Sequence, residues 1–164
     1  MNTQFETKHK GGKAGTHVWF TPKYIIDELG PFDLDPCTSI FRPFDTAINH
    51  YTPEDNGLFQ NWEGRVWCNP PYGSHASKWL SKLADHGNGI ALIFARTETN
   101  SFFDNVWNQA TALLFLKGRI RFCTQDGIQT KSNAGAPSVL IAYGENNADI
   151  LKNCSLEGAF VRLR

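Results

Sequence analysis

The sequence has 164 residues, of which 41% are hydrophobic, and its sixteen basic residues are balanced by sixteen acidic ones. This length is that of one domain, which buries a core without the help of disulfide bonds. No apolar stretch reaches the roughly 20 residues of a membrane-spanning helix, and the polar N-terminal residues lack the apolar segment of a signal peptide. Zero net charge argues against a histone-like protein that binds nucleic acid by bulk charge.

The spacing of cysteine and histidine argues against a zinc site and against a disulfide framework. The four cysteines include no Cys-x-x-Cys pair, and the five histidines show no metal-ligand spacing. A zinc site needs such spacing, and scattered cysteines do not suggest a disulfide framework. We therefore predict a protein without a metal site that works in the reducing environment of a cytoplasm.

Although the net charge is zero, acidic and basic residues are concentrated in different segments of the chain. Residues 32–63 hold six acidic residues and one basic residue, whereas residues 117–131 hold four basic residues and one acidic residue. An acidic region can hold a cation and a basic segment can hold an anion, although most surface charges in proteins simply face water. The two segments are thus candidate ligand-binding regions.

Composition changes near the start of the chain. Three glycines lie among lysines in residues 1–16, which predicts a flexible basic arm, and residues 17–164 predict a single domain. The first predicted helix has Thr21 as its N-cap and Pro22 at its first helical position, and it ends at a Gly-Pro pair. Its apolar residues recur on one face, which predicts a helix that packs on a core.

Predicted strands alternate with predicted helices along the rest of the chain. The patterns predict helices over residues 75–86 and 101–109. They predict strands over residues 32–35, 46–50, 65–68, 90–95, 112–116, 119–123, 138–143 and 159–163. This order predicts an α/β domain with a mostly parallel, twisted sheet and an antiparallel hairpin at its C-terminal end.

The most informative motif is Asn69-Pro70-Pro71-Tyr72, which directly follows an apolar strand. Two prolines remove two backbone donors and fix two φ angles, so the turn is stiff and its carbonyl groups are left as acceptors. The asparagine side chain adds another acceptor, and the tyrosine ring offers a stacking surface. Such a turn suits a planar base with an exocyclic amino group, although a short motif also occurs by chance in ordinary loops.

A second strand-to-turn junction, Asp35-Pro36-Cys37, precedes this motif in the chain. In an open parallel sheet, ligands bind beyond the carboxyl ends of the strands, where the strand order reverses. If the two strands are neighbours, both junctions line the same crevice.

These motifs resemble those of the small phage-type DNA N6-adenine methyltransferases of the Dam type. In that family a Trp-x-Thr-Pro segment, an FDLDPC segment, an acidic segment with Gly-Leu and a VW-x-NPPY segment follow one another. The chain holds all four in this order, at residues 19–22, 32–37, 55–58 and 66–72, and a further match at residues 117–122. The resemblance implies a Rossmann-like class I methyltransferase fold. One departure is that no Gly-x-Gly turn follows the first strand.

The resemblance also implies roles for individual residues. S-adenosylmethionine is the implied cofactor, and the residues implied to bind it are Trp19, Thr21, Pro22, Asp35, Pro36, Cys37, Asp55 and Leu58. The implied catalytic residues are Asn69, Pro70, Pro71 and Tyr72. Asn69 and the Pro70 carbonyl would accept hydrogen bonds from the target amino group, and Tyr72 would stack on the base after it has left the duplex.

Double-stranded DNA is the implied partner, and the loop at residues 123–137 is the predicted reading loop, because its asparagine and glutamine side chains can pair with base edges. Basic side chains would hold phosphates and make binding depend on salt. The predicted DNA-binding residues are Lys8, Lys10, Lys13, Arg119, Arg121, Gln125, Gln129, Lys131 and Asn133. We expect a monomer or weak homodimer, encoded by a phage or prophage and acting in the host cytoplasm.

Other conspicuous residues have plainer interpretations. Of the two carboxylates Asp33 and Asp35, we expect Asp35 to face the crevice and Asp33 to be a structural partner. Cys37 has no histidine–acid pattern nearby, which indicates a packed or cofactor-adjacent thiol rather than a nucleophile. Trp62, Trp67 and Trp107 are expected in the core.

Two other kinds of function remain open at this level. The NPPY turn also permits methylation of DNA cytosine N4, RNA adenine or a protein glutamine. A catalytically inactive DNA-binding protein of the same fold is a further alternative, against which the joint presence of the cofactor and target motifs argues.

Overall fold

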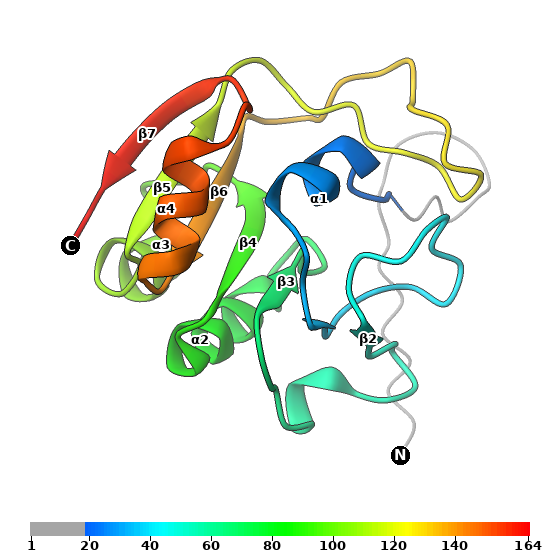
Figure 1. The fold of residues 1–164 in the computed structure, drawn as a ribbon, viewed down its shortest axis with the longest axis horizontal. Helices are drawn as coiled ribbons and strands as arrows, with labels where there is room; N and C mark the ends of the chain where they lie inside the picture. The colour runs from blue at the N-terminus through cyan, green and yellow to red at the C-terminus, as the bar shows by residue number, and fades with distance from the viewer. Residues whose placement is uncertain (1–18) are drawn as a thin grey trace.

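A seven-stranded sheet organises the chain, which a computed structural model describes over residues 19–164 (Figure 1). The strand order is β2-β1-β3-β4-β6-β5-β7. The strands are β1 (Leu34–Asp35), β2 (Asn49–His50), β3 (Val66–Cys68), β4 (Gly89–Phe94), β5 (Ala112–Leu116), β6 (Ser138–Tyr143) and β7 (Gly158–Arg162). The predicted basic arm, with Lys8, Lys10 and Lys13, lies outside the described residues.

The sheet divides into a parallel part and an antiparallel part. Strands β2, β1, β3 and β4 run parallel to one another. Strand β6 is antiparallel to β4 and β5, and β7 is antiparallel to β5. The predicted α/β class and the antiparallel C-terminal end are confirmed, with the parallel arrangement limited to four strands.

Helices cover both faces of this sheet (Figure 1). They are α1 (Lys23–Leu29), the 3-10 turn η1 (Gly57–Phe59), α2 (Ala76–His86), α3 (Asn100–Phe102), the π-helical turn η2 (Phe103–Trp107) and α4 (Glu145–Asn153). Helices α1 and α4 pack on one core, and α2 and η2 pack on the other. The predicted helix at residues 101–109 is thus a single α-turn that continues as a π-helix.

The central strands are buried on both faces, as their continuous apolar sequences predict. On β4, Ile90 and Leu92 face the core under α1 and α4, whereas Ala91 faces the core under α2. The same alternation runs along β6. A side-chain period of two in each strand therefore builds a three-layer domain with two separate cores.

The predicted strand at residues 119–123 is wrong as a strand but correct in its pattern of burial. Ile120 and Phe122 are buried, and Arg119 and Arg121 are exposed. The backbone makes only widely spaced bonds across an irregular hairpin, residues 117–137, so no regular ladder forms. Of residues 119–123, Cys123 alone takes part in isolated bridges, to Phe20 and to Gln129.

Two other local predictions are corrected by competing hydrogen bonds. Helix α1 begins one residue later than predicted, with Pro22 as its N-cap and Lys23 as its first helical residue, so no side chain caps it, and Oγ1 of Thr21 accepts from Asn69 instead. The predicted strand at residues 46–50 shortens to β2, since the backbone N–H groups of Thr46 and Ala47 both donate to Nε2 of His50. Helix α4 was not predicted, because its first turn contains two asparagines, which are poor helix formers.

Leu83→Ala tests the core under α2. Leu83 is fully buried, so its truncation leaves a cavity and should lower the free energy of unfolding by about 2–5 kcal/mol in urea denaturation. Lys78→Ala, at an exposed position of the same helix, should change it by less than about 0.5 kcal/mol. Equal effects of the two substitutions would contradict the assigned inner face of α2.

Candidate functional site

A cleft of about 1790 Å³ opens beyond the carboxyl ends of β1 and β3. The chain leaves β1 toward β2 and leaves β3 toward β4, on opposite sides, so this edge is the topological switch point of the parallel strands. Predicted site residues that line the cleft are Trp19, Thr21, Asp35, Cys37, Leu58, Asn69, Pro70, Pro71 and Tyr72. Pro22, Pro36 and Asp55 lie next to lining residues without lining the cleft themselves.

Asn69 begins the stiff turn after β3, and its side chain is held from one side. Its Nδ2 donates a hydrogen bond to Oγ1 of Thr21 over 3.0 Å. Its Oδ1 is buried and accepts no hydrogen bond from the described residues. The backbone carbonyl of Asn69 accepts from Sγ of Cys37 at 3.5 Å. The turn therefore presents a side-chain acceptor whose hydrogen-bonding capacity is unused by the described part of the protein.

The Tyr72 ring is oriented by two other aromatic rings. It stacks on Phe94 of β4 with a centroid separation of 4.3 Å and an interplanar angle of 17°. The Phe122 ring, from the 117–137 hairpin, packs edge to face with it at a centroid separation of 6.3 Å. Burial raises the pKa of the Tyr72 hydroxyl above its ordinary value, so the hydroxyl stays neutral at physiological pH. Tyr72 thus offers an aromatic surface rather than a base.

Asp35, at the end of β1, is a buried carboxylate. Oδ2 accepts from Oγ1 of Thr46 and Oδ1 accepts from the backbone N–H of Cys37. Burial raises the pKa of Asp35 to about 6, because desolvation outweighs these hydrogen bonds and the charge of Arg42. A buried carboxylate in a cleft favours a cationic or hydroxyl-bearing ligand, which would replace the water that it has lost.

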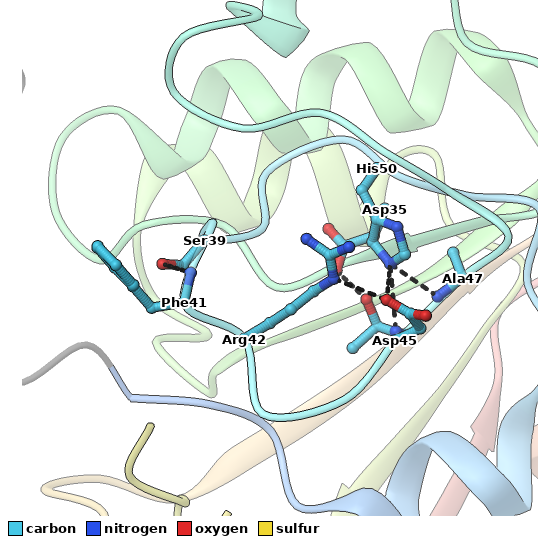
Figure 2. A network of polar contacts seen from close by, with 8 residues as sticks. Asp35, Ser39, Phe41, Arg42, Asp45, Ala47 and His50 are labelled. Atoms are coloured by element: carbon cyan, nitrogen blue, oxygen red, sulfur yellow. Dashed lines mark hydrogen bonds and ion pairs between the residues drawn. The ribbon is translucent and has the colours of Figure 1, made fainter. Parts of the chain in front are cut away.

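The loop between β1 and β2 surrounds Asp35, and Figure 2 shows its polar contacts. Arg42 Nε donates to Oδ1 of Asp45 at 2.9 Å. Burial and Arg42 lower the pKa of His50, so its ring stays neutral and accepts backbone N–H groups. The sequence did not assign Thr46 or Arg42 to the site, although Arg42 is the single basic residue of the acidic region.

The segment around η1 closes another side of the cleft. Both the backbone N–H and Oγ1 of Thr52 donate to Oδ2 of Asp55, which is exposed, and these bonds lower the pKa of Asp55. The Leu58 carbonyl accepts from Lys82 Nζ of α2 at 2.8 Å. A Cβ atom on Gly57 would lie 2.0 Å from the carbonyl oxygen of Pro36, so only glycine allows this close approach. Nothing in the sequence alone indicated that role.

The predicted DNA-binding side chains of the described region lie on the 117–137 hairpin, outside the cleft. Arg119 Nη1 donates to the carbonyl oxygens of Ala134 and Gly135, and Arg121 Nε donates to Oδ1 of Asn133 at 3.1 Å. Exposed positions on the same hairpin include Gln125, Gln129 and Lys131. The hairpin reaches the site through Phe122, which contacts Tyr72.

The plainer interpretations of three residue types are confirmed. Asp33 Oδ2 accepts from the backbone N–H of Arg65 at 2.6 Å, which is a structural contact between the residues that precede β1 and β3. The Cys37 and Cys68 sulfur atoms lie 3.8 Å apart. This contact and burial raise the pKa of Cys37 well above its ordinary value, so it is a packed thiol rather than a thiolate nucleophile. Trp62 and Trp67 are buried, and Trp107 packs against the core.

The described residues provide neither a metal-binding cluster nor a membrane-spanning helix. Residues 19–164 contain no cluster of three or more His, Cys, Asp or Glu side chains arranged to hold a metal ion. No helix in the same part of the chain combines the length and the apolar character needed to cross a membrane.

A strand-end cleft with a buried carboxylate, a stiff acceptor turn and an aromatic wall defines an α/β protein built to bind nucleoside-like ligands. Residues 8–156 match the family described as DNA N-6-adenine-methyltransferase (Dam), and the chain belongs to this family. The chain is also 24% identical over 148 residues to the DNA N-6-adenine-methyltransferase of Haemophilus phage HP1 (strain HP1c1), with 84% of each chain covered. No solved structure matches the chain. The family resemblance and the activity predicted from the motifs, N6-adenine methylation of DNA, are thereby confirmed.

The raised pKa of Asp35 predicts how stability depends on pH. The folded state binds the Asp35 proton more tightly than the unfolded state, so this residue's contribution is fully present below its unfolded pKa and is lost as pH rises through about 6. Wild-type protein should therefore gain about 2 kcal/mol of unfolding free energy relative to Asp35→Asn as pH falls from 8 to 4. Denaturant titrations at both pH values measure this difference, and parallel pH profiles would contradict it.

Proposed function

We propose that this chain transfers a methyl group from S-adenosylmethionine to N6 of an adenine that has been flipped out of double-stranded DNA. The observation that carries the proposal is the buried Oδ1 of Asn69, an acceptor without a partner among the described residues, on a residue that lines the cleft at the switch point of the sheet. A methyl donor cannot reach an amino nitrogen inside the helix, so the target base must enter this cleft. The finer assignment of the fold, a Rossmann-like class I methyltransferase, belongs to the same proposal.

The residues of the cleft fit the proposed cofactor. S-adenosylmethionine supplies the methyl group on a cationic sulfonium centre. Asp35 would hold the ammonium or ribose of the cofactor, and its buried carboxylate would regain the polar partner that burial removes. Leu58 would lie beside the adenine ring of the cofactor, and Trp19 with Thr21, next to Pro22, would cover the methionine part. The volume of the cleft leaves room for a base as well.

Asp55 would bind the adenine amino group of the cofactor. Both bonds from Thr52 go to Oδ2, which leaves Oδ1 for that acceptor role. The close packing of Gly57 against Pro36 brings the Asp55 segment next to the end of β1. Gly57 thus supplies a glycine at a close backbone approach in a chain that lacks the Gly-x-Gly turn after β1.

The acceptor turn would activate the target nitrogen without a strong base. The N6 lone pair of adenine is delocalised into the ring, and two acceptors that hold both amino protons favour a more tetrahedral, nucleophilic nitrogen. Oδ1 of Asn69 and the carbonyl of Pro70 would be these acceptors, and their dipoles would stabilise the positive charge that develops on the nitrogen. Pro71 keeps the turn stiff, and Tyr72, supported by Phe94, would stack on the base.

The 117–137 hairpin would bind the duplex beside the cleft. Arg119 and Arg121 are exposed on one side of the hairpin and would contact phosphates, while Gln125, Gln129, Lys131 and Asn133 would reach toward bases and backbone. Lys8, Lys10 and Lys13, outside the described residues, would add phosphate contacts. We further propose that residues 17–164 act as one domain, as a monomer or weak homodimer, in the cytoplasm of a bacterial host.

Asn69→Ala and Tyr72→Ala should each lower methyl transfer at least 100-fold while the protein stays folded, because each removes a group that holds the target base. The measurement is transfer of a labelled methyl group from S-adenosylmethionine to DNA, followed by digestion to nucleosides, with label expected on N6-methyladenine. Tyr72→Phe keeps the ring and should retain most activity.

Matched controls are available on exposed positions away from the cleft. Asn146→Ala on α4 and Tyr24→Ala on α1 make the same chemical changes and should leave turnover near wild type. Turnover near wild type in Asn69→Ala, or label on cytosine, would refute the proposed mechanism or target.

The double variant Arg119→Ala/Arg121→Ala should weaken DNA binding roughly tenfold, because it removes two phosphate contacts. The slope of log K against log salt should fall in magnitude by about 2. Fluorescence anisotropy at several salt concentrations measures both quantities. Lys152→Ala on α4 is a control that removes an exposed charge elsewhere, and an unchanged slope in the double variant would exclude the hairpin as the phosphate-binding element.

A further inference from the structure

We propose that Thr21 is a positioning residue for the reaction: its hydroxyl holds the Asn69 side chain so that Oδ1 is presented to the target amino group. The inference rests on the proposed function, in which Oδ1 is one of two acceptors for that group. It assigns the Thr21 hydroxyl a role in place of the helix cap that the sequence suggested and in addition to the cofactor contact proposed above.

The proposal rests on the different surroundings of the two ends of the Asn69 amide group. Nδ2 is bonded to Oγ1 of Thr21 at 3.0 Å, and Oδ1 is buried without a partner among the described residues. A free asparagine amide rotates about its Cβ–Cγ bond, and its donor and acceptor ends then exchange places. The Thr21 bond fixes the amide plane. Donation from Nδ2 also polarises the amide and strengthens Oδ1 as an acceptor.

Thr21 is itself held firmly enough to act as an anchor. It is only 4% exposed. The residue before it, Phe20, makes two backbone hydrogen bonds with Cys123, at 2.9 and 2.8 Å. The residue after it, Pro22, accepts from the backbone N–H of Ile25 in the first turn of α1. Thr21 is therefore fixed on both sides by the protein backbone, independently of Asn69.

The backbone of Asn69 is held from the other side of the cleft, through the bond from Cys37 Sγ to its carbonyl. The side chain and the backbone of one residue are thus fixed by two different segments. Loss of the Thr21 hydroxyl would free the amide while the turn itself stays in place. This selective effect makes the proposal testable.

The test compares Thr21→Val, which removes the hydroxyl with little change in shape, with Thr21→Ser, which keeps it. Turnover is measured on adenine-containing duplex DNA without N6-methyladenine, and binding of S-adenosylmethionine is measured by calorimetry. Thr21→Val should lower kcat about tenfold or more, with KM for DNA and Kd for the cofactor changed less than about threefold. Thr21→Ser should return kcat to within about threefold of wild type.

Thr111→Val is a matched control. Thr111 is also buried, and its Oγ1 also takes part in one hydrogen bond, from the backbone N–H of Gly144, next to the first residue of β5 and away from the cleft. Its kcat should stay near wild type even if its Tm falls. If Thr21→Val does not fold, Thr21→Ala removes the same hydroxyl without adding bulk and carries the same expectation.

A spectroscopic readout separates this inference from the proposed function. The side-chain amide resonances of Asn69, assigned by their absence in Asn69→Ala, should shift or broaden in Thr21→Val and stay in place in Thr21→Ser and Thr111→Val. If wild-type protein methylated no adenine, the proposed function would fall while these spectra would still decide whether Thr21 holds Asn69. The inference is overturned if the amide resonances are unmoved in Thr21→Val, if its kcat lies within twofold of wild type, or if the whole loss lies in Kd for the cofactor.

Discussion

The divergence of the chain after β1 and β3 is the constraint on which the site depends. These strands are neighbours and parallel, and their connections leave in opposite directions, so side chains after both strands meet without a covering loop between them. Asp35 and Cys37 follow one strand, and Asn69 and Tyr72 follow the other. The backbone direction of these two short strands thus brings the buried carboxylate and the acceptor turn to one edge.

The two sides of this edge differ in charge, and the difference suits two kinds of ligand. The β1 side carries a buried carboxylate, which favours a cation or hydroxyl groups. The β3 side carries neutral acceptors, namely an amide oxygen and proline carbonyls, in a turn stiffened by Pro70 and Pro71. In the proposed reaction these neutral acceptors would hold the amino protons, localise the nitrogen lone pair for attack and stabilise the positive charge that develops on the nitrogen.

Much of this arrangement could be predicted from the sequence, because the motifs follow apolar strands and parallel strands meet at their carboxyl ends. Contacts between distant segments could not. Thr21 has the sequence context of a helix cap, yet its partner is Asn69, 48 residues away. The fit of Gly57 against Pro36 likewise exists only after folding. Helix α4 was missed because packing of Ala148 and Leu151 compensates for an unfavourable first turn.

The irregular hairpin between β5 and β6 has a consequence for how such a protein can diverge. Its ends continue two buried strands, and its inner side chains, Ile120 and Phe122, pack on the core, whereas its tip is exposed. Because no strand ladder runs through the tip, residues there can change in number and kind without shifting the register of the sheet. If the hairpin reads DNA as proposed, an exchange of this surface segment would alter the sequence preference while the cleft and both cores keep their structure.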